Sequence, residues 1–100
     1  MTPLTSKQRA HLRSLAHHLK PVIQVGAEGV TPALLTTVEE AFNTRELLKV
    51  KVLEGAPEDV RETADRIQEG VEDVEVVQTI GRTAVLYRPD PDEPEIDLPR

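Results

Sequence analysis

Segments with helical periodicity alternate with segments of β-type patterning along the first 88 residues of this chain. Apolar residues three and four apart indicate three helices, and short runs of β-branched residues indicate four strands. In chain order the predicted segments are 5–20, 22–25, 31–42, 48–53, 57–71, 74–80 and 83–88. The order αβαβαββ predicts an α/β two-layer sandwich, with helices packed on a mostly four-stranded mixed sheet. A chain of 100 residues is expected to form one domain.

Start and stop signals define the three predicted helices. Thr5 and Gln8 have the spacing of a capping box, and Lys20-Pro21 ends that helix because proline disfavours helical backbone in the preceding residue. Thr31-Pro32 has the N-cap and first-turn proline of a second helix, and Pro57 is expected to open the third. The first helix is expected to bury Leu12, Leu15, Ala16 and Leu19.

The segment 48–53, Leu-Lys-Val-Lys-Val-Leu, alternates apolar and basic residues. Successive side chains of a strand point to opposite faces of the sheet. The alternation therefore predicts a strand with one buried face and with Lys49 and Lys51 on the other.

The net charge of −6 is unevenly distributed. Residues 1–53 carry seven basic and four acidic residues, a net charge of +3, and residues 54–100 carry five basic and fourteen acidic residues, a net charge of −9. Residues 89–100 hold five acids and four prolines, a composition that predicts an extended or disordered tail. The total charge alone argues against a nucleic-acid partner, but the basic first half does not.

Composition excludes several classes of function. The chain has no cysteine, which excludes disulfide scaffolds, thiol nucleophiles and cysteine-based metal sites. It has only two aromatic residues, which disfavours binding by stacking on aromatic side chains. No apolar run reaches the roughly 20 residues of a membrane span, and the N-terminus lacks the apolar stretch of a secretory signal. We expect a soluble cytoplasmic protein without a membrane partner.

The segment Gly26-Ala27-Glu28-Gly29 lies between a predicted strand and a predicted helix. Glycines allow close approach of a backbone, and the N–H groups of the next helix start attract anions such as phosphate. An ordinary strand-to-helix turn has the same composition, so both interpretations remain open. Glu28 places a negative charge where a bound phosphate would lie.

A set of basic residues has the charge to bind nucleic-acid phosphates if the fold places them on one face. The set comprises Arg9, Arg13, Lys20, Lys49, Lys51, Arg82 and Arg88. The interval from Arg9 to Lys20 contains no acid, which favours a basic face. Scattered basic residues more often form a solvated surface paired with local acids, and this alternative also remains open.

No pattern in the sequence indicates catalysis or a metal site. His11, His17 and His18 lack the i, i+4 spacing with a third ligand that a helical metal site requires. The acids of residues 54–75 surround a predicted apolar stripe as a solvated helix face does. We expect a non-enzymatic protein with no cofactor, no metal and no small-molecule substrate.

Several motifs occur in a fixed order over residues 4–88. They are Leu4-Thr5, Leu19-Lys20-Pro21, Gly26-x-x-Gly29, Thr31, Glu46-Leu47-Leu48-Lys49-Val50-Lys51, Gly81-Arg82 and Val85-Leu86-Tyr87-Arg88. Together they resemble the CRM domain, and more closely its bacterial stand-alone, YhbY-type members. The ending Ile96-x-Leu98-Pro99 is also similar to that of the family.

The resemblance implies a fold similar to the C-terminal domain of translation initiation factor three. It also implies RNA binding, association with precursors of the large ribosomal subunit, and a role in ribosome assembly. In the family the Gly-x-x-Gly loop usually carries a basic residue and is implicated in RNA contact. Here Ala27 and Glu28 occupy the loop instead, which shifts the expected phosphate contacts toward the first helix and the Lys49/Lys51 strand.

We therefore predict an RNA-binding domain over residues 1–88 that acts as a monomer on ribosomal RNA or large-subunit precursors. The predicted RNA-contacting residues are Arg9, Arg13, Lys20, Gly26, Ala27, Glu28, Gly29, Lys49, Lys51, Arg82 and Arg88. One alternative is a module that docks on a basic ribosomal or other protein through the acidic third helix. Another is a binder of small anions at the start of the second helix. The acidic tail is expected to screen non-specific RNA.

Overall fold

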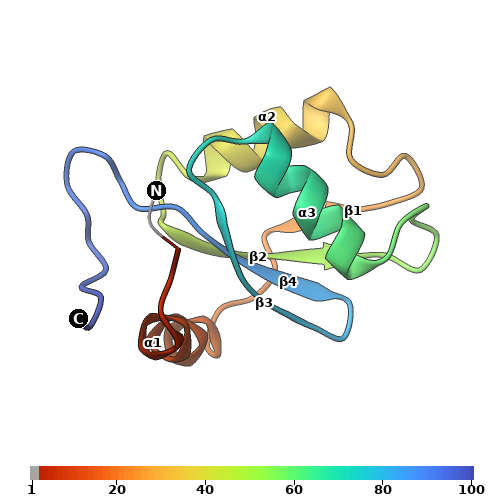
Figure 1. Ribbon diagram of the computed structural model, residues 1–100. Helices are drawn as coiled ribbons and strands as arrows, with labels where there is room; N and C mark the ends of the chain where they lie inside the picture. Colours follow the sequence, from red (N-terminus) through yellow and green to blue (C-terminus); the bar gives the residue numbers. More distant parts are fainter. Residues whose placement is uncertain (1–2) are drawn as a thin grey trace.

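The computed structural model describes residues 3–100 and contains three helices and four strands (Figure 1). Met1 and Thr2 lie outside the described residues. In chain order the elements are α1 (Ser6–Ala16), β1 (Ile23–Val25), α2 (Pro32–Ala41), β2 (Leu47–Val52), α3 (Val60–Gly70), β3 (Glu75–Ile80) and β4 (Thr83–Tyr87). The strands form one sheet in the order β1-β2-β4-β3, with β1 parallel to β2 and the other pairs antiparallel. The α/β class, the element order and the mixed sheet are as predicted.

Helices cover both faces of the sheet (Figure 1). Helices α2 and α3 lie on one face, over a core that includes Val38, Leu48, Val50, Ile67 and Leu86. Helix α1 lies on the other face, over a smaller core of Leu12, Ala16, Leu47, Val77, Val85 and Tyr87. The structure therefore differs from the predicted two-layer arrangement, because α1 adds a third layer. The physical reason is that β2 and β4 carry apolar side chains on both faces, and each apolar face needs cover.

Helix α1 begins where the sequence predicts and ends earlier. The Thr5 hydroxyl accepts the Gln8 N–H at 3.1 Å, and the Gln8 side chain accepts the Thr5 N–H at 3.0 Å, which completes the capping box. The helix ends at Ala16, so the prediction that it continues to Lys20 was wrong.

The early end of α1 changes which apolar residues are buried. Leu12 and Ala16 are fully covered, whereas Leu15 and Leu19 remain 40% and 38% exposed. Leu19 follows the last helical turn, so it no longer shares the helical stripe that its spacing predicted.

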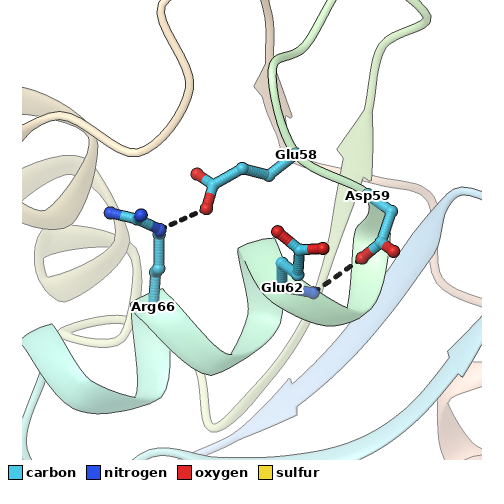
Figure 2. Close-up of polar contacts among 4 residues, drawn as sticks. All are labelled: Glu58, Asp59, Glu62 and Arg66. Carbon is cyan, nitrogen blue, oxygen red and sulfur yellow. Dashed lines mark hydrogen bonds and ion pairs between the residues drawn. The ribbon is translucent and has the colours of Figure 1, made fainter.

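Helix α3 begins at Val60 rather than at the predicted Pro57. Asp59 is its N-cap and accepts the Glu62 N–H at 2.8 Å (Figure 2). Just before the cap, Glu58 forms an ion pair with Arg66 of the second helical turn (Figure 2). The cap is therefore a carboxylate, which satisfies a free helix N–H and suits the positive end of the helix dipole.

The chain after β4 has no helix or strand but is held on the α1 side of the sheet (Figure 1). Ile96 and Leu98 pack against the core beneath α1, as Leu4 does. The Gln8 side-chain amide donates to the Pro99 carbonyl at 3.2 Å. In residues 3–100 no helix is long and apolar enough to cross a membrane.

Candidate nucleic-acid interface

Helix α1 leaves part of its sheet face uncovered, and four residues form a row across all four strands there. The strand registers pair Gln24 with Lys51, Lys51 with Thr83, and Thr83 with Ile80. Their chain neighbours Ile23, Val50 and Ala84 belong to the core under α2 and α3, so the row points to the opposite face. We call Gln24, Lys51, Thr83 and Ile80 the open face. Gln24 and Lys51 are exposed, and Ile80 is 61% exposed.

A pocket of about 200 Å³ lies between the last turn of α1 and the open face. Its polar lining comes from Arg13 of α1, the C-cap residue His17, Lys49 of β2, Gln78 of β3 and Thr83 of β4. Arg13 and His17 are four residues apart and so lie on the same side of the helix. None of the lining residues is acidic. The fold therefore joins the predicted Arg13 and Lys49 around one pocket, and Lys51 lies beside it on β2.

The Lys49 side chain also contacts the protein backbone beside the pocket. Its ammonium group donates to the Leu19 carbonyl at 2.9 Å, in the connection between α1 and β1. This contact uses one of the three ammonium donors and fixes the position of the charge at the edge of the pocket. Pro21, from the same connection, also lines the pocket.

The Arg9 side chain hydrogen-bonds to the backbone of β3. Its guanidinium donates to the carbonyls of Val76 and Val77 at 2.6 and 3.1 Å. These residues lie at a β-bulge, where the β3–β4 register shifts between Val76 and Gln78. In this structure the Arg9 guanidinium holds the bulge, and its phosphate contact stays a prediction.

The loop Gly26–Gly29 is a tight turn whose last residue must be glycine. The Gly29 N–H donates to the Gly26 carbonyl at 3.0 Å, and Gly29 has a φ of +69°. A Cβ at Gly29 would lie 2.8 Å from Pro57 Cγ. Ala27 and Glu28 are exposed at the tip of the turn. Gln24 of the open face lines one hollow together with this loop and the first turns of α2.

Arg82 lies in the β3–β4 turn, next to Thr83 of the open face. It lines a second hollow together with three acids, Glu54, Glu58 and Asp59. Arg82 thus lies between the open face and a hollow lined by acidic residues.

Arg88 and Lys20 do not line the pocket. The Arg88 guanidinium lies 5.5 Å from the Phe42 ring centroid and 4.0 Å from the Glu39 carboxylate, on the α2 face of the sheet. Lys20 lies in the α1–β1 connection and shares a groove with Arg45. Arg88 is therefore not brought together with Lys51.

Sequence reasoning missed Gln24, Gln78 and Thr83 as members of the site. For Gln24 and Thr83 the signal was present, because each alternates with core residues in a strand. For Gln78 no sequence signal was available. The bulge places both Val77 and Gln78 on the α1 face, which simple alternation does not predict.

The family model described as the CRS1 / YhbY (CRM) domain matches residues 4–88. This chain belongs to the CRM domain family. The predicted family is thereby confirmed, and the matched range includes the open face, the pocket and the Gly26–Gly29 loop.

Three similar proteins match this CRM domain over nearly their full lengths. "Probable RNA-binding protein YqeI" of Bacillus subtilis is 44% identical over 96 residues, covering 96% of this chain and 99% of its own. A Haemophilus influenzae protein named "RNA-binding protein" is 43% identical over 100 residues, covering 100% of this chain and 99% of its own. The solution structure of SAV1595 from Staphylococcus aureus has a TM-score of 0.79 and 38% identity, covering 96% and 99% of the two chains.

Proposed function

We propose that this CRM domain binds RNA, and that its target is ribosomal RNA in precursors of the large ribosomal subunit, where it acts as an assembly factor. Two similar proteins of almost the same length are named as RNA-binding proteins, which supports the RNA-binding part. The part concerning ribosome assembly rests on the resemblance to YhbY-type proteins. The proposal assigns no catalytic step to the chain.

The observation that carries the proposal is the convergence of Arg13, Lys49 and Lys51 at the open face, from a helix and a strand far apart in the sequence. Phosphate contacts give affinity and position, and each cation that releases a counterion adds to binding. With few aromatic residues in the chain, the shape of folded RNA supplies most of the specificity.

The acidic third helix supports the alternative of a protein-docking module less well. Glu58 is paired with Arg66, and Asp59 caps the helix, so two acids near its start have roles in the fold (Figure 2). Small-anion binding at the start of α2 is likewise less supported, because exposed Glu28 adds negative charge to the loop that precedes it.

Sedimentation of cell extract tests the proposal. The wild-type protein is expected to migrate with large-subunit precursors and to be released by ribonuclease. Arg13→Glu combined with Lys51→Glu is expected to abolish this association. The matched control is Arg61→Glu, which makes the same type of change at an exposed position of α3. Co-migration that survives both ribonuclease and the double reversal would refute RNA binding through this face.

A further inference from the structure

The pocket beside α1 combines three kinds of surface. Arg13 and Lys49 bring positive charge, Gln78 and Thr83 bring hydrogen-bonding groups, and Ile80 brings an exposed apolar side chain. Within residues 3–100, the side chains of Gln78 and Thr83 have no hydrogen bond to the protein. Both are half-buried and line the pocket, so they have hydrogen-bonding capacity for a ligand there.

We propose that this pocket holds one unpaired nucleotide of the bound RNA. The phosphate lies against Arg13 and Lys49, and the base rests on Ile80. Gln78 and Thr83 then reach the edge of the base and the ribose hydroxyl. This inference rests on the proposed function, since it names the RNA feature that the same face recognises.

The size of the pocket suits the base of one nucleotide, which is smaller than a drug-sized ligand. Pockets for drug-sized ligands usually measure roughly 300–1,000 Å³, and this one measures about 200 Å³. Lys51 and Gln24 continue the open face from Thr83 onto β2 and β1, where the neighbouring nucleotides of a continuous chain can follow.

The chemistry of the lining matches an unpaired base. A glutamine amide offers one acceptor and two donors, the pattern used to bind base edges. RNA-binding proteins recognise sequence mostly at unpaired nucleotides, whose bases are splayed out of the helix, and the 2′-hydroxyl is both donor and acceptor. Aromatic side chains usually support such bases, and here Ile80 supplies the apolar contact instead.

The β-bulge is the structural device that builds this site. In a regular strand, Gln78 and Val77 would point to opposite faces. The bulge lets Val77 enter the core beneath α1 while Gln78 lines the pocket. Arg9 holds the carbonyls of Val76 and Val77, so it acts as a positioning residue for Gln78. Bulges commonly redirect a side chain next to a functional site.

Hairpin RNAs that differ at a single nucleotide test the proposal. The probes are a fully paired hairpin, the same hairpin with one unpaired nucleotide carrying each of the four bases in turn, and that hairpin with an abasic unpaired residue. Affinities are measured by fluorescence anisotropy at fixed salt. At least one base is expected to bind about fivefold more tightly than the paired and abasic hairpins.

Two substitutions in the pocket test whether it is the source of that preference. Gln78→Ala and the nearly isosteric Thr83→Val are each expected to lower the preference, while the salt dependence of binding stays unchanged. Gln68→Ala, at an exposed position of α3, is the matched control and is expected to keep the preference.

Two results would overturn the proposal. Equal binding of all the hairpins by wild-type protein would refute the pocket and leave the proposed function standing, provided that Arg13→Glu weakens binding. If the preference for an unpaired base persists in both Gln78→Ala and Thr83→Val, the nucleotide binds outside this pocket and the proposal is wrong. Failure of every hairpin to bind, together with no association in sedimentation, would refute the proposed function itself.

Discussion

The carboxylate of Glu46 accepts the backbone N–H of Ile96 at 2.7 Å, across fifty residues of chain. The same carboxylate accepts the N–H groups of Glu95 at 2.8 Å and Asp90 at 2.5 Å. Glu46 is only 6% exposed. A buried carboxylate needs such donors, and here the C-terminal segment supplies them. Burial raises the pKa of the Tyr87 hydroxyl, and the negative charge of Glu46 raises it further.

We predict that Glu46→Gln lowers the free energy of unfolding by about 1–3 kcal/mol, because the amide keeps one acceptor oxygen and leaves a part-buried N–H of the C-terminal segment without an acceptor. Urea denaturation measures the change. Glu40→Gln makes the same substitution at an exposed position of α2 and is expected to stay within about 0.5 kcal/mol of wild type. Equal effects of the two variants would show that the contacts at Glu46 contribute nothing to stability.

The screening role of the acidic tail can be tested by changing its charge and keeping its anchors. The triple variant Asp92→Asn, Glu93→Gln and Asp97→Asn removes three acids and retains Ile96 and Leu98. Asp90 is also kept, because its carboxylate accepts the N–H groups of Glu93 and Asp92, which lower its pKa.

We expect the triple variant to bind non-specific RNA about threefold more tightly at low salt, with the difference disappearing at high salt. Fluorescence anisotropy with a random-sequence RNA measures it, and an unchanged melting temperature confirms that the tail remains in place. Unchanged or weaker binding at low salt would refute the screening role. Deleting residues 89–100 is a less specific test, since it also removes the apolar contacts of Ile96 and Leu98.

Arg9 and Lys51 are expected to respond differently to substitution. Lys51→Ala removes an exposed cation from the open face, so the slope of log affinity against log salt concentration should become shallower by about 0.7–0.9. Arg9→Met should leave that slope unchanged, reduce stability by about 1.5–3 kcal/mol and weaken the preference for an unpaired base, because the bulge loses its donor. Salt titrations and urea denaturation separate the two roles. A shallower slope for Arg9→Met would instead place Arg9 at a phosphate.

The two glycines of the Gly26–Gly29 loop are expected to differ in tolerance. Gly29→Ala should destabilise the protein by about 1–3 kcal/mol, because φ is positive and the new Cβ would lie 2.8 Å from Pro57 Cγ. Gly26→Ala should have a much smaller effect, since the nearest atom to its Cβ is Leu53 Cδ1 at 3.9 Å. Thermal or urea unfolding of the pair measures the difference. Equal destabilisation would contradict the geometry of the turn.

Glu28→Lys tests whether the loop contacts RNA. If the loop tip approaches a phosphate, replacing the anion by a cation should tighten RNA binding several-fold and steepen the salt dependence. Glu69→Lys makes the same charge change at an exposed position near the end of α3 and serves as the control for net charge. An equal gain in both variants would show that only net charge matters and that the loop does not contact RNA.

Local patterns were sufficient to predict the elements of this fold. The capping box at Thr5 and the Thr31-Pro32 start are formed as predicted, because cap geometry depends on residues within one turn. Helix ends and the third layer were less predictable. The position of α1 depends on apolar side chains of β2 and β4 that meet only after the sheet forms.

The sequence by itself determined the family, the order of helices and strands, the mixed sheet and the inventory of basic residues. The tertiary structure alone decided which of those residues share a surface. It joined Arg13 to Lys49, turned Arg9 to the β3 carbonyls and Arg88 to Phe42, and placed the C-terminal segment against Glu46. The physical reason is that charge and periodicity are local properties of the chain. Which residues become neighbours depends on strand register, the β-bulge and the face of the sheet that each helix covers.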